Sequence, residues 1–317
     1  MRFACVKLPE PLDGHCSTIE ASLRMNPTPL LDKRTIRRHF DRAAPTYERA
    51  AALQREVAAR MLERLDLIKL QPARILDAGS GTGLVTRTLG RRYPDAGIVQ
   101  LDLSLRMLRE ATAAGSFWRQ LMRLARTPAR VCGDMEKLPL RSAMVDLVCS
   151  NLALEWCERP AEALREFNRV LRRGGLLMFT TLGPDTLREL RAVFSTSGSA
   201  PAVHPFADMH DIGDLLVSSG FADPVMDMER LTLTYADLTA LFADLRASGC
   251  QCALASAHRG LHGRTWPALL AQHYAAFLQD GRLPATFEIV YGHAWKAEQG
   301  PRVAADGRAI IQFQPKR

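Results

Sequence analysis

The segment most informative about the fold reads Ile75-Leu76-Asp77-Ala78-Gly79-Ser80-Gly81-Thr82-Gly83. It stands where an apolar run predicts the end of a strand and where a helical pattern begins. Glycines at such a junction allow a tight turn and a close approach of the backbone to a ligand. The N-terminus of the following helix adds free N–H groups and the positive end of a dipole. The segment therefore predicts a ligand-binding loop of an open α/β sheet.

The residues of this loop distinguish between classes of ligand. The dinucleotide fingerprint G-x-G-x-x-G needs a glycine at position 84, where the chain has Leu84. A nucleotide-triphosphate loop needs G-x-x-x-x-G-K-[ST], and no lysine stands here. What remains is D-x-G-x-G-x-G, in which Asp77 would repel a pyrophosphate but suits a ligand with an ammonium group.

The alternation of short apolar runs with helical patterns continues outward from the loop and predicts a Rossmann-like α/β fold. Strands are expected at Arg74–Ala78, Gly97–Leu103, Ala129–Gly133, Val145–Ser150, Leu176–Leu182, Val225–Tyr235 and Thr286–Trp295. Helices are expected near 32–43, 46–65, 83–92, 104–114, 160–172, 185–197, 208–219 and 236–248, with an irregular helical stretch at 250–283. The glycine pair after Arg172 and Arg173 is expected to end the helix at 160–172. The sum is a seven-stranded sheet with helices on both faces.

Composition limits the function classes. The chain has 317 residues, and 42 Lys and Arg against 34 Asp and Glu give a net charge of +8, which suggests an acidic partner. No apolar stretch approaches the ~18 residues of a membrane helix, and no signal peptide is evident. The 7 cysteines are an odd number without a paired spacing, so neither a disulfide framework nor a metal site is expected, and a cytoplasmic location fits best.

Acidic residues follow the glycine loop in order, with Asp102 and Asp134 each expected at the end of a strand. This arrangement resembles class I S-adenosylmethionine-dependent methyltransferases. The resemblance implies that Asp102 accepts hydrogen bonds from ribose hydroxyls, that Asp134 and the Met135 backbone contact adenine, and that Asn151 stands beside the sulfonium. The implied cofactor-binding residues are Gln54, Asp77, Gly79, Ser80, Gly81, Gly83, Asp102, Leu103, Asp134, Met135 and Asn151.

Four further segments narrow the resemblance to the malonyl-[acyl-carrier protein] O-methyltransferases of biotin synthesis. They are Phe40–Tyr47, Asn151–Cys157, Phe179–Gly183 and Leu283–Trp295. The resemblance implies methyl transfer from S-adenosylmethionine to the free carboxylate of a malonyl thioester. The thioester partner would be acyl-carrier protein or coenzyme A.

Three rival functions stay open at this point. An arginine-hydroxylating mitochondrial assembly factor shares much of the pattern, and a non-catalytic S-adenosylmethionine-binding scaffold would keep the same loop. A nucleic-acid methyltransferase is disfavoured, because the Asp/Asn-Pro-Pro-aromatic motif expected after the fourth strand is absent from Ser150–Cys157. No nucleic-acid or membrane partner is therefore expected.

The family resemblance also implies a division of the chain. An irregular leader at 1–31, expected to be disordered, precedes a methyltransferase domain at 32–297, and a tail follows at 298–317. Within the domain, a helical lid covers 32–70, the core covers 71–183, and late strands with helical insertions cover 184–297.

Six side chains are candidates for work outside the cofactor loop. Tyr47 is the candidate catalytic residue of the lid, against the alternative of a half-buried helix aromatic. Arg188 and Arg191 could bind the malonyl carboxylate, against the alternative of a solvated helix face. The basic segment with Arg119, Arg123 and Arg126 could dock an acidic carrier protein, or it could be a solvated basic face.

Overall fold

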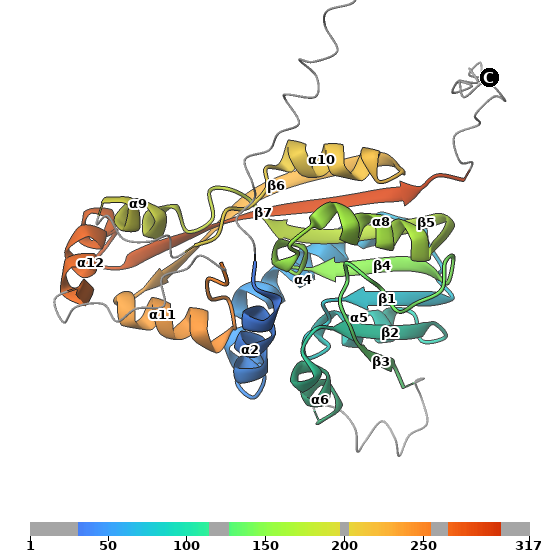
Figure 1. Cartoon of the computed structure of the whole chain (residues 1–317), viewed down its shortest axis with the longest axis horizontal. Helices are drawn as coiled ribbons and strands as arrows, with labels where there is room; N and C mark the ends of the chain where they lie inside the picture. The colour runs from blue at the N-terminus through green and yellow to red at the C-terminus, as the bar shows by residue number, and fades with distance from the viewer. Residues whose placement is uncertain (1–30, 114–126, 197–202, 255–265, 299–317) are drawn as a thin grey trace, which may run out of the picture.

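A computed structural model describes residues 31–113, 127–196, 203–254 and 266–298 (Figure 1). Residues 1–30 of the expected leader and 299–317 of the expected tail lie outside these ranges. The expected docking residues Arg119, Arg123 and Arg126 lie outside them as well. No helix among the described residues is long and apolar enough to cross a membrane.

A seven-stranded sheet forms the centre of the molecule, in the order β3-β2-β1-β4-β5-β7-β6. The strands are β1 (Arg74–Ala78), β2 (Gly97–Asp102), β3 (Ala129–Cys132), β4 (Val145–Asn151), β5 (Leu171–Leu182), β6 (Phe221–Tyr235) and β7 (Leu283–Lys296). The first five are parallel, and β7 runs antiparallel to both β5 and β6. The predicted seven-stranded α/β fold is confirmed.

Several helices come before the first strand in chain order. In space, helices cover both faces of the sheet, and others lie around the extended ends of β6 and β7 (Figure 1). The helices are α2 (Lys33–Ala43), α3 (Tyr47–Ala50), α4 (Ala52–Asp66), α5 (Leu84–Arg92), α6 (Leu105–Ala113), α8 (Pro160–Val170), α9 (Arg188–Thr196), α10 (Met209–Ser218), α11 (Leu238–Ala247) and α12 (Trp266–Tyr274), with short 3₁₀ helices η1 (Leu154–Trp156) and η2 (Ala275–Phe277). α8 and α10 pack on one face of the sheet, and α4 and α5 pack on the other.

The alternation of side chains along each strand divides the core into two layers. Ile75 of β1 joins the layer under α4 and α5, while its neighbour Leu76 joins the layer under α8 and α10. Both residues are fully buried. Because both faces are covered, β1 is buried from Ile75 to Ala78, as is typical of parallel strands.

β5, β6 and β7 begin at Leu171, Phe221 and Leu283, three to five residues before their expected starts, and two helix boundaries were wrong. The single helix expected at 46–65 is broken at Ala51, whose φ of −78° and ψ of 49° are not helical. The helix expected at 160–172 ends at Val170, because Leu171 already pairs with Val145 in the sheet. The glycine pair that was expected to end the helix lies inside β5, where Gly174 has a φ of +68°.

The change in strand order between β1 and β4 positions the site. Chain connections leave β1 toward β2 on one side and reach β4 on the other, so the carboxyl ends of β1 and β4 border a crevice. α2 lies across the edge of the sheet at which β1, β4 and β5 end (Figure 1). This edge carries the glycine loop and the acids expected to bind the cofactor.

Candidate active site

The glycine loop is held in a tight turn over the end of β2. The backbone N–H groups of Gly79 and Ser80 donate to the carbonyl of Leu101 at 2.8 and 3.0 Å. Gly79 has a φ of +74°, which side chains disfavour, and a Cβ there would overlap the methyl group of Ala153. Only glycine suits this position, because the backbone of the loop must lie against the segment after β4.

Asp102 shapes the same loop from the end of β2. Its carboxylate accepts hydrogen bonds from the N–H groups of Gly81 and Ser104, both at 2.8 Å. Burial raises the pKa of Asp102 to about 6, although both hydrogen bonds oppose the shift. A carboxylate offers about four acceptor positions, so two remain for a ligand.

A cavity opens beside this loop, and we call it the glycine-loop cavity. It encloses about 630 Å³ of empty space. Eight residues predicted from the sequence line it, namely Tyr47, Gly79, Gly81, Asp102, Leu103, Asp134, Met135 and Asn151. The fold therefore brings residues from five separate parts of the chain to one cavity.

The remaining four predicted cofactor residues do not line the glycine-loop cavity. Asp77 is only 1% exposed, and it accepts a hydrogen bond of 2.5 Å from Thr86 in the first turn of α5. Burial raises the pKa of Asp77 to about 7. Asp77, Ser80 and Gly83 stand behind the cavity wall, and Gln54 lines a neighbouring cavity. Asp77 thus caps the helix that follows the loop.

Lys33 fastens α2 to the ends of the strands. Its ammonium group pairs with Asp134 and, at 2.8 Å, with Glu136. Burial acts to lower the pKa of Lys33, but the two carboxylates raise it overall. Lys33 and its partner Asp134 both line the glycine-loop cavity. The first residue of α2 is therefore part of the site.

α3 and α4 are tied to the loop as well. Glu48 accepts hydrogen bonds from the Thr82 hydroxyl at 2.6 Å and from Arg87 at 2.8 Å. The amide of Asn151 donates to the Gln54 carbonyl at 3.1 Å. The Tyr47 ring lies close to Gly81, since a Cβ at that position would lie 3.6 Å from the ring. The N-terminal helices consequently cover the glycine loop.

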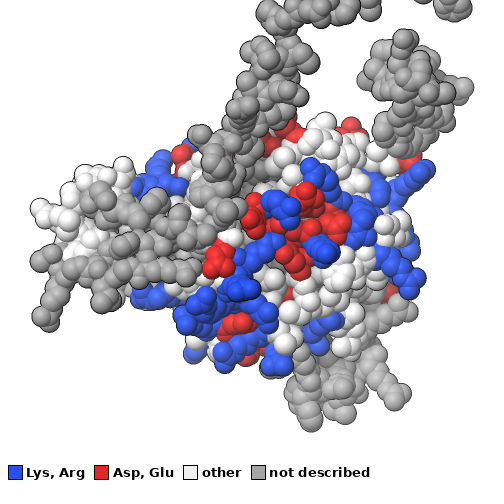
Figure 2. Space-filling view, in the orientation of Figure 1, with Lys and Arg blue, Asp and Glu red and all other residues white. Residues whose placement is uncertain are grey.

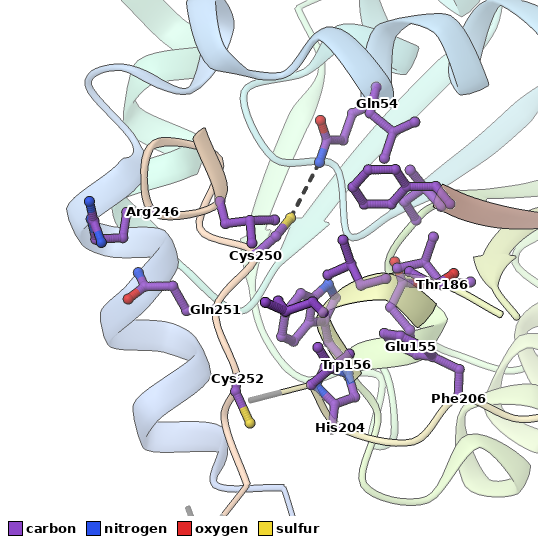
Figure 3. Close-up of a pocket in the computed structure, with 18 of the residues that line it drawn as sticks. Gln54, Glu155, Trp156, Thr186, His204, Phe206, Arg246, Cys250, Gln251 and Cys252 are labelled. Atoms are coloured by element: carbon purple, nitrogen blue, oxygen red, sulfur yellow. Dashed lines mark hydrogen bonds between the residues drawn. The ribbon is translucent and has the colours of Figure 1, made fainter. Parts of the chain in front are cut away.

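A second cavity adjoins the first, and we call it the aromatic cavity. It encloses about 950 Å³ of empty space, some of it open to solvent. Phe40, Tyr47, Leu152 and Trp156 line both cavities. In Figure 3, Arg246 and Gln251 lie on one side of the aromatic cavity, Glu155, Trp156 and His204 lie on the other, and Gln54 lies above them. A ligand in one cavity can thus meet a ligand in the other at this shared wall.

Three titratable side chains of the aromatic cavity, Glu155, His204 and Tyr47, are uncharged near neutral pH. Burial raises the pKa of Glu155 to about 8, against a hydrogen bond from Thr181 at 3.2 Å. Burial lowers the pKa of His204 to about 4, and Arg191 lowers it further. Burial also raises the pKa of Tyr47 well above its usual value. An anionic ligand would therefore meet no negative charge from these three side chains.

The two arginines expected to bind a carboxylate line neither cavity. Arg191 donates to the carbonyls of Thr186 at 3.1 Å and His204 at 2.9 Å, so it holds the cavity wall from behind. The Arg188 side chain is 58% exposed and lies 3.4 Å from Glu189. Arg246 of α11 does line the aromatic cavity.

Sequence reasoning missed Lys33 and Arg246 as site residues. Neither belongs to a motif, and each is far in sequence from the glycine loop. Their contribution comes from the packing of α2 and α11 over the strand ends. Among the described residues, no group of three or more His, Cys, Asp and Glu side chains could hold a metal ion.

Glu155→Gln is expected to make folding stability less dependent on pH. A raised pKa means that folded Glu155 keeps a proton which the unfolded chain releases above its ordinary pKa, so this group lowers stability as pH rises from about 4.5 to about 8. Glutamine keeps the shape without the proton. Thermal unfolding at pH 5 and pH 8 should show a Tm gain of a few degrees at pH 8 only. Equal shifts at both pH values would contradict this expectation.

Comparisons with known proteins agree with this geometry. Residues 76–179 match the family described as "Methyltransferase domain". The chain is 54% identical to a malonyl-[acyl-carrier protein] O-methyltransferase of Laribacter hongkongensis over 90% of this chain and 96% of that protein. It is 50% identical to one of Gallionella capsiferriformans over 89% of this chain and 97% of that protein. A solved putative methyltransferase of Bacillus halodurans shares the fold, with a TM-score of 0.54, 18% identity, and coverage of 75% of this chain and 99% of the other.

Proposed function

Because this chain belongs to the malonyl-[acyl-carrier protein] O-methyltransferase family, we propose that it transfers a methyl group from S-adenosylmethionine to the free carboxylate of a malonyl thioester. The observation that carries the proposal is an identity of 54% over 90% of the chain. Esterification removes the charge of the malonyl group, so the product can be elongated like an ordinary fatty-acid primer. This places the reaction early in biotin synthesis.

The glycine-loop cavity suits S-adenosylmethionine by its donor and acceptor groups. Asp102 keeps acceptor positions for ribose hydroxyls, and Leu103 and Met135 offer apolar contact to the adenine. The absence of a side chain at Gly79 lets the loop backbone lie directly against Ala153 in the wall of this cavity. When bound, S-adenosylmethionine supplies an electrophilic methyl carbon on its sulfonium sulfur.

The transfer is proposed to occur at the wall that the two cavities share. The acceptor carboxylate is already an anionic nucleophile, so the step needs no general base. One carboxylate oxygen forms the bond to the methyl carbon while the bond between carbon and sulfur breaks and its electron pair stays on sulfur. Tyr47, Phe40 and Trp156 would act by holding the two groups in line and excluding water.

The aromatic cavity suits a malonyl group because its buried titratable residues are neutral. An ionised Glu155 would repel the acceptor carboxylate, whereas the raised pKa of Glu155 keeps the side chain protonated at neutral pH. A protonated carboxyl group can also donate a hydrogen bond to the acceptor. Glu155 is therefore proposed as a neutral polar contact of the acceptor.

The thioester carrier is proposed to be an acyl-carrier protein, with coenzyme A as the alternative. The names of the relatives include the carrier protein. A cytoplasmic location is proposed too, because Cys132, Cys149, Cys157 and Cys250 are free thiols, as suits a reducing compartment.

The rival functions receive no support from the comparisons. The relatives are named for transfer to malonyl-[acyl-carrier protein], and none of those reported above is named for arginine hydroxylation. A non-catalytic scaffold would need a closed acceptor side, but the aromatic cavity is open to solvent and adjoins the glycine-loop cavity.

Complementation tests this proposal in a cell. A biotin-requiring bacterial strain that lacks its own malonyl-[acyl-carrier protein] O-methyltransferase should grow without biotin when it expresses this chain. The same strain expressing the Gly79→Ala variant should still require biotin. No growth with the wild-type chain, produced in folded form, would count against the assigned acceptor.

A further inference from the structure

α2 carries a row of arginines that the mechanism does not use. The helix contains Lys33 and four arginines, against the single acid Asp41. Arg34, Arg38 and Arg42 are spaced four residues apart, so they lie along one side of the helix. All three are exposed. We call these three residues the α2 arginine row.

The row is not neutralised by neighbouring acids. Within the described ranges, Arg34 and Arg42 have no ion pair, and Arg38 has only a contact of 3.4 Å to the Thr35 hydroxyl. Figure 2 shows Lys and Arg side chains gathered over α2 around a smaller acidic patch, with a larger acidic area beside them. The charge of the row is therefore available to a partner.

The pKa of His39 reports the same positive field. Burial lowers it first, and the charges of Arg42 and Arg38 lower it further. The field is local, because the glycine-loop cavity nearby is lined by Asp102 and Asp134. Positive charge thus gathers on the outer side of α2, away from the acids of the cavity.

The position of the row ties it to the acceptor side of the site. Phe40, from the same helix, lines both cavities. α11 packs beside α2, and a Cβ on Gly249 would lie 2.7 Å from the Phe40 ring. Arg246, at the end of α11, is exposed and lines the aromatic cavity, and it has no ion pair with a described acid. Positive charge therefore extends from α2 to the opening of the aromatic cavity.

We propose that the α2 arginine row, together with Arg246, is the docking surface for the acidic carrier protein that delivers the malonyl thioester. The inference rests on the proposed function, because only a substrate tethered to a protein needs a surface outside the cavity. Opposite charges on two such surfaces speed encounter and fix the orientation of the partner. A carrier bound to α2 would hold its thioester arm at the mouth of the aromatic cavity.

The test compares two acceptors for one charge-reversed protein. The triple variant Arg34→Glu, Arg38→Glu, Arg42→Glu should raise the KM for malonyl-acyl-carrier protein by about tenfold or more, because each reversed pair weakens docking severalfold. The KM for the malonyl thioester of pantetheine should stay within about twofold, because this acceptor lacks the protein and has an uncharged arm. S-adenosylmethionine affinity, measured by calorimetry, reports whether the variant keeps its fold.

A matched control carries the same change of charge elsewhere. Arg91, Arg141 and Arg165 lie on α5, on the loop before β4 and on α8, and their reversal to Glu should leave both KM values unchanged. For the wild-type protein, added salt should raise the KM for the carrier thioester more than that for the pantetheine thioester. This salt series needs no variant, so it tests the proposal even if the triple variant does not fold.

The outcomes separate the two proposals. A wild-type protein that methylates neither thioester would overturn the proposed function itself. A wild-type protein that methylates both, while the triple variant or added salt affects both equally or neither, would overturn the docking surface alone. A loss with the control triple as large as that with the α2 triple would overturn it too.

Discussion

Gly79→Ala is expected to reduce the affinity for S-adenosylmethionine by about thirtyfold or more. Alanine at the φ of +74° costs about 1–2 kcal/mol. The new methyl group would also overlap that of Ala153, and overpacking of this kind costs about 1–3 kcal/mol. The loop can relieve both only by moving away from the segment after β4, which disturbs the cavity wall. Since 1.4 kcal/mol is a factor of ten, isothermal titration should resolve the loss.

A second glycine provides the matched control. Gly213 lies within α10, and a Cβ there would meet nothing within 4 Å. Gly213→Ala should leave the affinity for S-adenosylmethionine unchanged and raise Tm slightly, because alanine favours a helix over glycine by about 1 kcal/mol. Unchanged affinity in Gly79→Ala would contradict the assignment of the glycine loop.

Tyr47→Ala is expected to lower kcat by about a hundredfold. Tyr47 lines both cavities, so its removal opens their shared wall to water and frees the acceptor to move. Misplacement of reacting groups by about 1 Å can cost about a hundredfold in rate. The effect should appear mainly in kcat rather than in the KM for S-adenosylmethionine. Steady-state kinetics with malonyl-acyl-carrier protein measures both.

Tyr47→Phe separates the ring from the hydroxyl. If the ring acts by covering the junction, Tyr47→Phe should retain most of the activity, and a loss as large as that of Tyr47→Ala would assign the effect to the hydroxyl. Tyr235→Phe is the control, because it removes a hydroxyl that bonds Asp244 at 2.7 Å outside both cavities. Full activity in Tyr47→Ala would rule out a catalytic role for this residue.

Much of the fold could be predicted from local pattern, because the glycine loop and each strand-end acid are recognised from the few residues directly around them. β1 was predicted with its observed bounds, Arg74–Ala78. The break at Ala51 could not be predicted, since it depends on distant contacts. Glu48 of α3 must reach Thr82 and Arg87, and a continuous helix would not give α3 its own direction.

The residues on the acceptor side of the site were harder to predict from the sequence. Arg188 and Arg191 come after β5, and their place in the chain allowed either a carboxylate site or a solvated helix face. In the structure Arg191 donates hydrogen bonds to the carbonyls of Thr186 and His204 instead. Burial at this position lowers the pKa of Arg191. Arg246 lines the aromatic cavity only because α11 packs against α2. Such packing between distant segments leaves no signal in local spacing.

The most direct test of methyl transfer to a malonyl thioester uses S-adenosylmethionine with a labelled methyl group and malonyl-acyl-carrier protein as acceptor. The purified protein should transfer label to the carrier in a form that mild base releases, as expected of a methyl ester, and carrier without the malonyl group should receive none. Absence of base-labile label on malonyl-acyl-carrier protein, from protein that still binds S-adenosylmethionine, would contradict the account.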